Sequence, residues 1–374
     1  MPHDPDTRNA SPAASTCRAI RHHRRMDDAP VRVVLVQLGG WRGLHAPDRL
    51  KGTHKPMDNF AAAVVQDTPV FLDLRRSVQK ACHLIAEVAR TGAKLIVFPE
   101  TWLPGYPVWL DESPKAGLWD YPPAKALFAE LFENSLELPG PELEELGKAA
   151  RAAQATVVMG AHERSAGTLY NTLFYIAHTG ELAGIHRKIM PTYTERLIWG
   201  QGDGSTLTVI DTPQGRVGGL ICWEHWMPLL RAAMHQQQEL VHVAQWPAVK
   251  EMNHVAVREY AFEGQCFVVA AGGCLKKSEA FCTNKPNSLL DEIPGDPEWL
   301  LMRGGSAIIA PDGSYLAGPL YDEPGVLVAE IRPSLAIEGR LLIDTCGHYS
   351  RPDIFRLSVN TGARQNVVFD ERGL

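Results

Sequence analysis

The sequence predicts one α/β domain in which helices cover mixed β-sheets. Strand-like apolar runs alternate with amphipathic helices between residues 60 and 163, the order expected when parallel strands are joined by helices. Two pairs of strand-like runs around Gly-containing turns follow at 170–188 and 205–224, and they indicate antiparallel hairpins. The alternation of strands and helices resumes after residue 228, so we expect both parallel and antiparallel pairing.

The first helix is predicted directly after the strand FAAAVVQ at 60–66. It covers LDLRRSVQKACHLIAEVARTG at 72–92, where apolar residues recur on one face. Asp73 is a candidate N-cap, and Gly92 is a candidate for the residue that ends the helix. Cys82 falls on the apolar face and is therefore predicted to be a core residue.

The other elements are predicted from apolar runs bounded by turn signals. They are, in order, a strand at 93–100, a helix at 140–155, a strand at 156–163, the two hairpins, a helix from Pro228, a strand at 239–246, a helix ending near 265, a strand at 266–273, a hairpin at 306–319 and a strand at 325–331. Residues 275–303 are polar and contain several prolines, so a loop is expected there.

Residues 1–56 are predicted to be a poorly ordered N-terminal extension, and residues 57–374 the folded domain. The run RVVLVQ at 32–37 resembles a first strand, but it would need a structureless connection of roughly 35 residues, longer than usual loops. The strand at 60–66 needs only a few connecting residues, and Met57 is a natural alternative start. Charged residues interrupt the N-terminal apolar run, so a secretory signal is not predicted.

Composition excludes several classes of protein. The chain has 374 residues, of which 45% are hydrophobic and 21% charged, as in an ordinary globular protein with a large core. A formal net charge of −6 gives no basic footprint for nucleic acid, and no apolar run approaches the length of a membrane helix. The seven cysteines form no CxxC pair, and such a sparse, odd set predicts reduced thiols in the cytoplasm. We therefore expect a small neutral or polar molecule as the partner.

Three reactive side chains lie at the ends of apolar runs. Glu100 closes LIVFPE, Lys188 closes AGIHRK and Cys222 closes GGLIC. Because open α/β sheets place their sites beyond strand ends, we expect these residues at one site. A nucleophilic thiolate needs a nearby cation, a helix N-terminus or a base, and here Lys188 can be the cation and Glu100 the base.

Each of these residues also has a purely structural interpretation. Free cysteine is so often buried that Cys222 alone reads as a core thiol. Glu100 alone reads as a loop carboxylate or a cap, and Lys188 as a solvated hairpin residue. His225 lies close to the cysteine, but sequence does not give its direction. The residues alone therefore leave the function open.

No metal or organic cofactor is predicted. His235 and His242 are seven residues apart across a predicted helix–strand junction, and His22 and His23 lie in the extension. Neither set has the spacing of metal ligands.

In combination, the motifs resemble the nitrilase superfamily of carbon–nitrogen hydrolases. The resemblance runs from about residue 57 to about residue 357 and is closest to the nitrilase branch, on FPETWLPGYPVW, HRKIMPTYTERLIWGQGDGS, CWEHWMPLLR, VHVAQWP, REYAFEGQCFV and GHYSRPDIF. It implies a four-layer αββα sandwich and a homo-oligomer, either a dimer or a multiple of it. It also implies a reaction that needs no cofactor.

The same resemblance implies the roles of individual residues. The catalytic set would be Glu100, Lys188, Glu195 and Cys222. The substrate would be bound by Trp223, Trp199 and Tyr106, although each of these aromatic residues is as well explained as part of the core. Cys222 would form a thioimidate and then a thioester, so that an organic nitrile becomes a carboxylic acid and ammonia.

Three alternatives stay open at this level. An amidase or N-carbamoyl hydrolase would use the same four residues on a carbon–nitrogen single bond. A cyanide-hydrolysing enzyme would differ in substrate alone, and a non-enzymatic relative would use the fold as a binding module. The intact set of four residues argues against the last of these.

Overall fold

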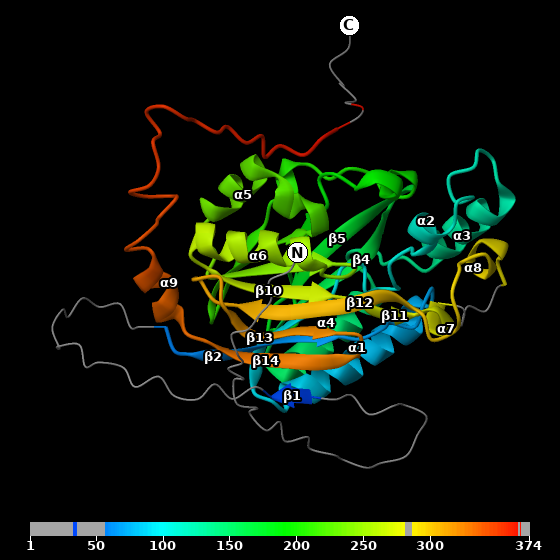
Figure 1. Ribbon diagram of the computed structural model, residues 1–374, viewed down its shortest axis with the longest axis horizontal. Coiled ribbons are helices and arrows are strands. Elements are labelled where there is room, and N and C mark those ends of the chain that lie inside the picture. Colours follow the sequence, from blue (N-terminus) through cyan, green and yellow to red (C-terminus); the bar gives the residue numbers. More distant parts are fainter. Residues whose placement is uncertain (1–32, 36–56, 281–285, 366, 368–374) are drawn as a thin grey trace, which may run out of the picture.

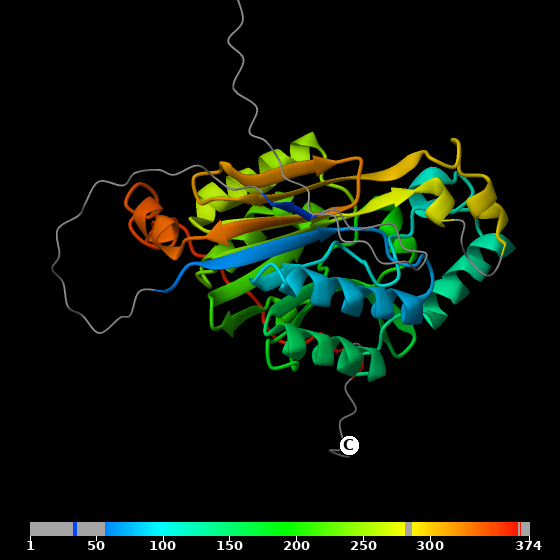
Figure 2. The ribbon, with the colours of Figure 1, turned by 90° about the horizontal axis from the view of Figure 1, so that it is seen from below.

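Two β-sheets pack face to face, and helices cover the outer face of each (Figures 1 and 2). The computed structural model describes residues 33–35, 57–280, 286–365 and 367. The layer order is helix, sheet, sheet, helix, so the predicted α/β class and αββα sandwich are confirmed. Among the described residues, no helix is long and apolar enough to cross a membrane.

The first sheet has seven strands. Their spatial order is β1 (Val33–Leu35), β14 (Gly325–Ile331), β2 (Phe60–Gln66), β3 (Ala93–Val97), β4 (Thr156–Ser165), β5 (Thr168–Ile176) and β6 (Leu182–Arg187). The strands β2, β3 and β4 are parallel, whereas β14 with β2, β4 with β5, and β5 with β6 are antiparallel. The sheet is therefore mixed, and its β5–β6 hairpin is the one predicted at 170–188.

The second sheet is also mixed. Its strands lie in the order β11 (Cys274–Lys276), β12 (Leu300–Ile309), β10 (Phe267–Gly272), β9 (Val241–Trp246), β8 (Gly215–Ile221) and β7 (Val209–Thr212), and β13 (Tyr315–Tyr321) also pairs with β12. The strands β8, β9 and β10 are parallel, and the other pairs are antiparallel. The predicted hairpin at 205–224 is the β7–β8 pair.

Alternation along the strands separates two cores. In β2, Ala62 and Val64 face the second sheet, whereas Ala63 and Val65 face the helices. The outer layer on this side is α1 (Leu74–Ala89) with α4 (Pro141–Ala153), and on the other side α5 (Pro228–His235) with α6 (Glu251–Gly264). Burying each large apolar side chain in such layers contributes roughly 1.5–3 kcal/mol. Each sheet is therefore stabilised on both faces, by helices outside and by the other sheet inside.

Shorter helices lie at the two ends of the sandwich. In Figure 1, α2 (Trp109–Glu112), α3 (Pro122–Glu133), α7 (Lys277–Ala280) and α8 (Ser288–Asp291) gather at one end, and α9 (Pro333–Gly339) lies at the other. Three 3₁₀ turns carry or flank the candidate site: η1 (Tyr193–Leu197), η2 (Gly204–Thr206) and η3 (Cys222–Trp226). A third apolar cluster, which includes Phe71, Tyr106 and Trp199, packs beneath α2 and α3.

The predicted N-cap of the first helix is confirmed, whereas the end of the helix and the burial of Cys82 differ from the prediction. Asp73 is the N-cap of α1, and its side chain accepts a hydrogen bond from the Arg76 N–H at 2.9 Å. The helix ends at Ala89, and Gly92 takes a positive φ of +83° in the turn that follows. Cys82 is only partly buried against the outer core.

Two expectations need correction. The loop expected at 275–303 is wrong in part, because it contains α7, α8 and the start of β12; the apolar residues at 300–302 extend that strand to pair with β11. Val33–Leu35, placed in the extension by sequence, pair in parallel with β14 at the sheet edge. The other residues of the predicted extension lie outside the described part of the chain.

Candidate active site

Strand topology brings Glu100, Lys188 and Cys222 together. Lys188 directly follows β6, and Glu100 follows β3 by three residues. Because β6 is antiparallel to β5, and β5 is antiparallel to β4, β6 runs in the same direction as β4 and β3. Both residues therefore leave the same edge of the first sheet, while Cys222 leaves the end of β8 in the facing sheet.

The turn that carries Glu100 requires a glycine at position 160 of the neighbouring strand. Gly160 of β4 lies against it so closely that a Cβ would stand 2.5 Å from both the Pro99 carbonyl oxygen and the Thr101 nitrogen. Thr101 itself has a positive φ of +41°, an unfavourable backbone conformation for a β-branched residue. The packing against β4 therefore holds Glu100 in a strained turn.

Cys222 occupies a second strained turn. Its φ is +56°, in the left-handed region that non-glycine residues rarely adopt. The buried Glu224 carboxylate accepts hydrogen bonds from the N–H of Ile221 and the N–H of Ile189, each at 2.7 Å. Glu224 thereby ties the turn of Cys222 to the chain that follows Lys188.

His186 completes this tie between the two sheets. Its Nε2 lies 2.9 Å from Glu224 Oε2, and its Nδ1 lies 2.9 Å from the Thr206 carbonyl oxygen. Both partners are acceptors, so both ring nitrogens must donate. Burial alone would lower the pKa of His186, but Glu224 outweighs it and raises the pKa, so the ring is held as an imidazolium.

Lys188 lies between two buried carboxylates. Its Nζ donates to Glu100 Oε1 at 2.9 Å and to Glu195 Oε2 at 2.7 Å, and all three side chains are buried. Burial alone would lower the pKa of Lys188, but Glu100, Cys222 and Glu195 together raise it above its ordinary value. The ammonium charge therefore persists inside the protein.

Glu100 is poised to exchange a proton near neutral pH. Burial, with a further contribution from Glu195, raises its pKa from 4.5 to about 7, against the opposing effects of Lys188 and Asn171. The side-chain amide of Asn171 donates to Glu100 Oε1 at 2.7 Å, whereas Oε2 has no hydrogen-bond partner among the described residues. One carboxylate oxygen is thus fixed and the other is left to accept or give a proton.

The thiol of Cys222 lies beside this carboxylate. Ligand-type atoms of Cys222, Glu100 and Glu195 all lie within 4.8 Å of one another. Burial and then the charge of Glu100 raise the pKa of Cys222 well above its ordinary value, although Lys188 and the Trp223 N–H lower it. A neutral thiol beside a base of pKa near 7 can react as a nucleophile once the base removes its proton.

The aromatic residues expected to bind substrate fall into two groups. Tyr106 and Trp199 are buried: the Tyr106 hydroxyl donates to Glu195 Oε1 at 3.1 Å, and the Trp199 ring lies 5.7 Å from Lys188 Nζ. Trp223 is 57% exposed, so its ring can form a wall open to solvent. Tyr106 and Trp199 therefore contact the ion cluster directly, while Trp223 lies outside it.

Several residues around the cluster were missed by sequence reasoning. They are Asn171, His162, His186 and Glu224. His162 is typical: its Nδ1 accepts from Trp199 Nε1 at 3.0 Å, and its Nε2 donates to the Gly105 carbonyl oxygen at 2.9 Å. Burial lowers its pKa to about 4, so it stays neutral. No spacing in the sequence signals such long-range pairs, because strand register sets them.

The structure also gives the direction of His225. Its Nδ1 lies 2.7 Å from the backbone carbonyl oxygen of Cys222, and its Nε2 lies 3.0 Å from His242 Nε2. Both nitrogens are engaged, and the ring is fully buried. His225 is therefore not placed to take the proton of the Cys222 thiol.

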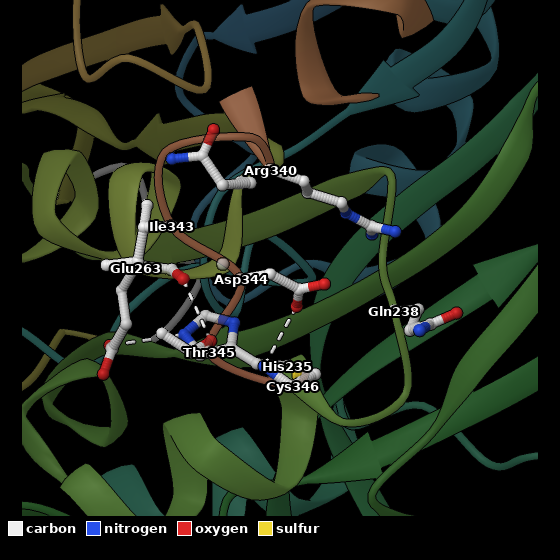
Figure 3. A pocket seen from close by; sticks show the side chains of 10 residues that line it. His235, Gln238, Glu263, Arg340, Ile343, Asp344, Thr345 and Cys346 are labelled. Carbon is white, nitrogen blue, oxygen red and sulfur yellow. Dashed lines mark hydrogen bonds and ion pairs between the residues drawn. The ribbon is translucent and has the colours of Figure 1, made fainter. Parts of the chain in front are cut away.

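Neither of two hollows in the described part of the structure is lined by residues of the cluster. One, of about 320 Å³, is lined mainly by apolar side chains of the α2–α3 segment together with Leu197 and Ile198, next to Trp199. The other is polar and lies under the segment after α9, with His235, Glu263 and Asp344 on its walls (Figure 3). Its volume of about 10 Å³ suits at most one water molecule, so it is too small for a substrate.

The Lys188 ammonium occupies the position between the two carboxylates that a metal ion would need. Glu100, Glu195 and Cys222 form the one group of described residues whose atoms are close enough to share an ion. Lys188 Nζ already donates to both carboxylates. The positive charge that such a group needs is thus supplied by the chain itself.

Comparisons with known proteins agree with this geometry. The profile of the carbon-nitrogen hydrolase family matches residues 61–340. An aliphatic nitrilase from Sinorhizobium fredii is 38% identical over 312 residues, which cover 83% of this chain and 99% of that protein. A nitrilase from Bradyrhizobium diazoefficiens is 39% identical over 310 residues, which cover 83% of this chain and 95% of the relative.

Solved structures resemble the chain in fold. A carbon-nitrogen hydrolase from Helicobacter pylori has a TM-score of 0.60 at 18% identity, covering 79% of this chain and 97% of that one. A mutant amidase of Nesterenkonia, from the nitrilase superfamily, has a TM-score of 0.56 at 17% identity, covering 77% and 96%.

The αββα sandwich brings a thiol, two carboxylates and an ammonium together in one buried cluster, an arrangement that suits hydrolysis by a cysteine nucleophile. The family match and the two relatives then make the assignment specific: the chain belongs to the carbon-nitrogen hydrolase family.

The proton equilibrium of Glu100 predicts how Cys222 reacts with an alkylating agent. Glu100 is neutral below a pH of about 7 and anionic above it, and only the anion can take the thiol proton. We expect alkylation of Cys222 by iodoacetamide, followed by peptide mass spectrometry, to accelerate as pH rises through about 7. Glu100→Gln should remove this step, while alkylation of the partly exposed Cys82 keeps its own pH dependence. A step that survives in Glu100→Gln would contradict the role of Glu100.

Proposed function

We propose that the protein is a cytoplasmic, homo-oligomeric nitrilase that hydrolyses an organic nitrile to the carboxylic acid and ammonia. The observation that carries the proposal is the buried cluster in which Lys188 bridges Glu100 and Glu195 beside the Cys222 thiol. The relatives that bear the name nitrilase, at 38% and 39% identity over most of the chain, support nitriles as the substrate class.

The first step forms a covalent bond to Cys222. Glu100 accepts the thiol proton through its free Oε2, and the sulfur adds to the nitrile carbon to give a thioimidate. The nitrogen of the former nitrile gains a proton, which Glu100 returns. Lys188 and the Trp223 N–H stabilise the negative charge that develops during addition, because both donors are already fixed beside the sulfur.

Two molecules of water complete the reaction. The first adds to the thioimidate carbon, and the resulting tetrahedral species expels ammonia to leave a thioester on Cys222. The second attacks the thioester and releases the carboxylic acid and the free thiol. Glu100 serves as base for each water and as acid for the leaving ammonia, a double role for which a pKa of about 7 is suited.

Glu195 and its neighbours hold the cation in place. The Glu195 carboxylate accepts from Lys188, from the Thr192 N–H at 2.6 Å and from the Tyr106 hydroxyl. These donors fix Glu195, and Glu195 in turn fixes the direction of the ammonium. The Trp199 ring lies over the ammonium of Lys188, and the exposed ring of Trp223 would contact the organic group of the nitrile in this proposal.

A product-resolved assay tests the substrate class. Aliphatic nitriles, arylaliphatic nitriles and cyanide would be compared with the corresponding amides, with ammonia, acid and amide all measured. We expect organic nitriles to be converted mainly to acid. Faster hydrolysis of the amides would instead assign an amidase, and turnover of cyanide alone would assign a cyanide-hydrolysing enzyme.

Two variants give this assay its control. Cys222→Ala should lower kcat by at least about a thousandfold, since the covalent route is lost. Cys82→Ala removes a thiol on α1, remote from the cluster, and should leave kcat unchanged. A Cys222→Ala protein that still makes acid and ammonia at the normal rate would refute the proposal.

The location and the oligomer rest on separate observations. All five described cysteines are free thiols, as in a reducing compartment. On α6, Met252, Val255 and Phe262 are exposed and lie three and seven residues apart, so they form one apolar stripe. A helix face of this kind suits burial against a second copy of the chain.

Light scattering of the purified protein tests the oligomer. We expect a dimer or a multiple of it for the wild type, and smaller particles for Met252→Glu combined with Phe262→Glu. The exposed Trp119, in the α2–α3 connection at another part of the surface, provides the control Trp119→Glu. A wild-type protein that is monomeric at micromolar concentration would contradict the proposal.

A further inference from the structure

A chain of three buried side chains leads away from the nucleophile on its far side. His225 Nδ1 lies 2.7 Å from the Cys222 carbonyl oxygen, His225 Nε2 lies 3.0 Å from His242 Nε2, and His242 Nδ1 lies 2.9 Å from Glu239 Oε1. All three side chains are at most 3% exposed. The proposed mechanism uses none of them.

The hydrogen bonds fix the number of protons in this chain. The Cys222 carbonyl can only accept, so His225 Nδ1 must carry a hydrogen. Glu239 likewise accepts, so His242 Nδ1 carries one too. The contact between the two Nε2 atoms needs one further hydrogen. The rings of His225 and His242 therefore carry three N–H protons between them, so one of the two rings is a positively charged imidazolium.

The surroundings place the positive charge on His242. Its ring lies directly between His225 and the Glu239 carboxylate. Burial raises the pKa of Glu239, but His242, Tyr260 and His235 together outweigh burial and lower it. Burial and then His242 lower the pKa of His225 well below its ordinary value, so His225 is the neutral ring. The Tyr260 hydroxyl donates to Glu239 Oε2 at 2.6 Å and fixes its other oxygen.

The remaining charges near the chain are already paired. Arg231 of α5 donates to the His225 carbonyl oxygen at 3.0 Å, and its other nitrogens meet Glu263 at 2.8 Å and Glu259 at 3.3 Å. His235 lies against Tyr260 and pairs with Glu263, and His186 pairs with Glu224. Glu239 is therefore the carboxylate that balances His242.

Packing holds each member of the chain in one orientation. The His225 ring stacks on Trp246 at 5.0 Å, and the His242 ring stacks on Tyr260 at 3.7 Å between ring centroids. Gly218 of β8 leaves the space that the Glu239 carboxylate fills, because a Cβ there would overlap it. The strands themselves thus make room for a buried charge next to the nucleophile turn.

The hydrogen-bonded chain of Glu239, His242 and His225 reaches the reacting residue at the backbone carbonyl oxygen of Cys222. Cys222 has the strained φ of +56°, and its thiol must stay aligned with Glu100. A hydrogen bond to its carbonyl opposes rotation of the peptide that follows the cysteine, the same peptide whose Trp223 N–H contacts the thiol.

We propose that Glu239, His242 and His225 are positioning residues, which hold the Cys222–Trp223 peptide through one shared proton and so keep the thiol and the Trp223 N–H in register. This role rests on the proposed thiol chemistry. It predicts that loss of the chain lowers kcat far more than it changes KM, because substrate still enters an unaltered pocket.

Variants of the full-length protein separate positioning from folding. His225→Asn keeps a side-chain N–H at the place of Nδ1, whereas His225→Ala removes it. Losing one buried hydrogen bond should lower kcat about tenfold in His225→Ala, and His225→Asn should restore most of it. Glu239→Gln removes the charge that keeps the shared proton, and it should resemble His225→Ala.

His254→Asn is the matched control. His254 is a buried histidine of α6. Its ring contacts Tyr315 and Tyr321 and is not part of the hydrogen-bonded chain of Glu239, His242 and His225. His254→Asn should lower the thermal stability about as much as the His225 variants do, and it should leave kcat unchanged. Equal losses of kcat in His225→Asn and His225→Ala, or unchanged kcat in Glu239→Gln, would overturn the proposal.

Nitrogen-15 NMR of histidine-labelled protein tests the proton count without any substrate. We expect His186 to be protonated on both nitrogens, together with a second such ring, assigned to His242 by its loss in His242→Asn. We expect His225 to be neutral and protonated on Nδ1. Neutral rings at both His225 and His242 would refute the proposed chain. If the wild type turned over no nitrile yet gave the expected spectrum, the proposed function would fail while the proton count stood.

Discussion

The arrangement of the site depends on one buried ammonium. Lys188 lies in a protein interior where an unpaired charge would cost several kcal/mol, and two carboxylates meet it at 2.9 and 2.7 Å. Each partner is then fixed by other groups: Asn171 holds Glu100, and Thr192 and Tyr106 hold Glu195. Because Lys188 and Asn171 both donate to Oε1 of Glu100, its Oε2 has no hydrogen-bond partner among the described residues and is free to take the thiol proton.

This arrangement trades stability for reactivity. The pKa of Glu100 is raised from 4.5 to about 7, so its ionisation is opposed by the folded state. The contribution of the neutral Glu100 carboxyl to the free energy of unfolding is fully present below about pH 4.5 and is lost as pH rises through about 7. Cys222 and Thr101 also keep positive φ angles that cost free energy. Strained turns and a carboxyl of raised pKa at one place are typical of sites that the surrounding fold holds ready for chemistry.

Local patterns in the sequence predict the α/β class with mixed sheets and the strand-end residues of the site, whereas the four layers and Glu195 were implied by the resemblance to the nitrilase superfamily. Apolar alternation gives the strands, and strand ends give Glu100, Lys188 and Cys222. What sequence missed depends on register between distant segments: Asn171 reaches Glu100 across 71 residues, and His186 reaches Glu224 across 38. The direction of His225 is of the same kind, because only the neighbouring strand β9 supplies its partner His242. The short helices α7 and α8 were not predicted, because polar, Pro-containing segments predict loops.

In the proposed reaction, Cys222 forms a covalent bond to the substrate carbon beside Glu100, Lys188 and Glu195. Carbon-13 NMR of the enzyme with an aldehyde analogue of its best nitrile, labelled at the carbonyl carbon, tests it most directly. We predict the resonance of a tetrahedral thiohemiacetal in the wild type and its disappearance in Cys222→Ala. An aldehyde that inhibits the enzyme yet shows only the resonances of the free aldehyde and its hydrate would contradict the account.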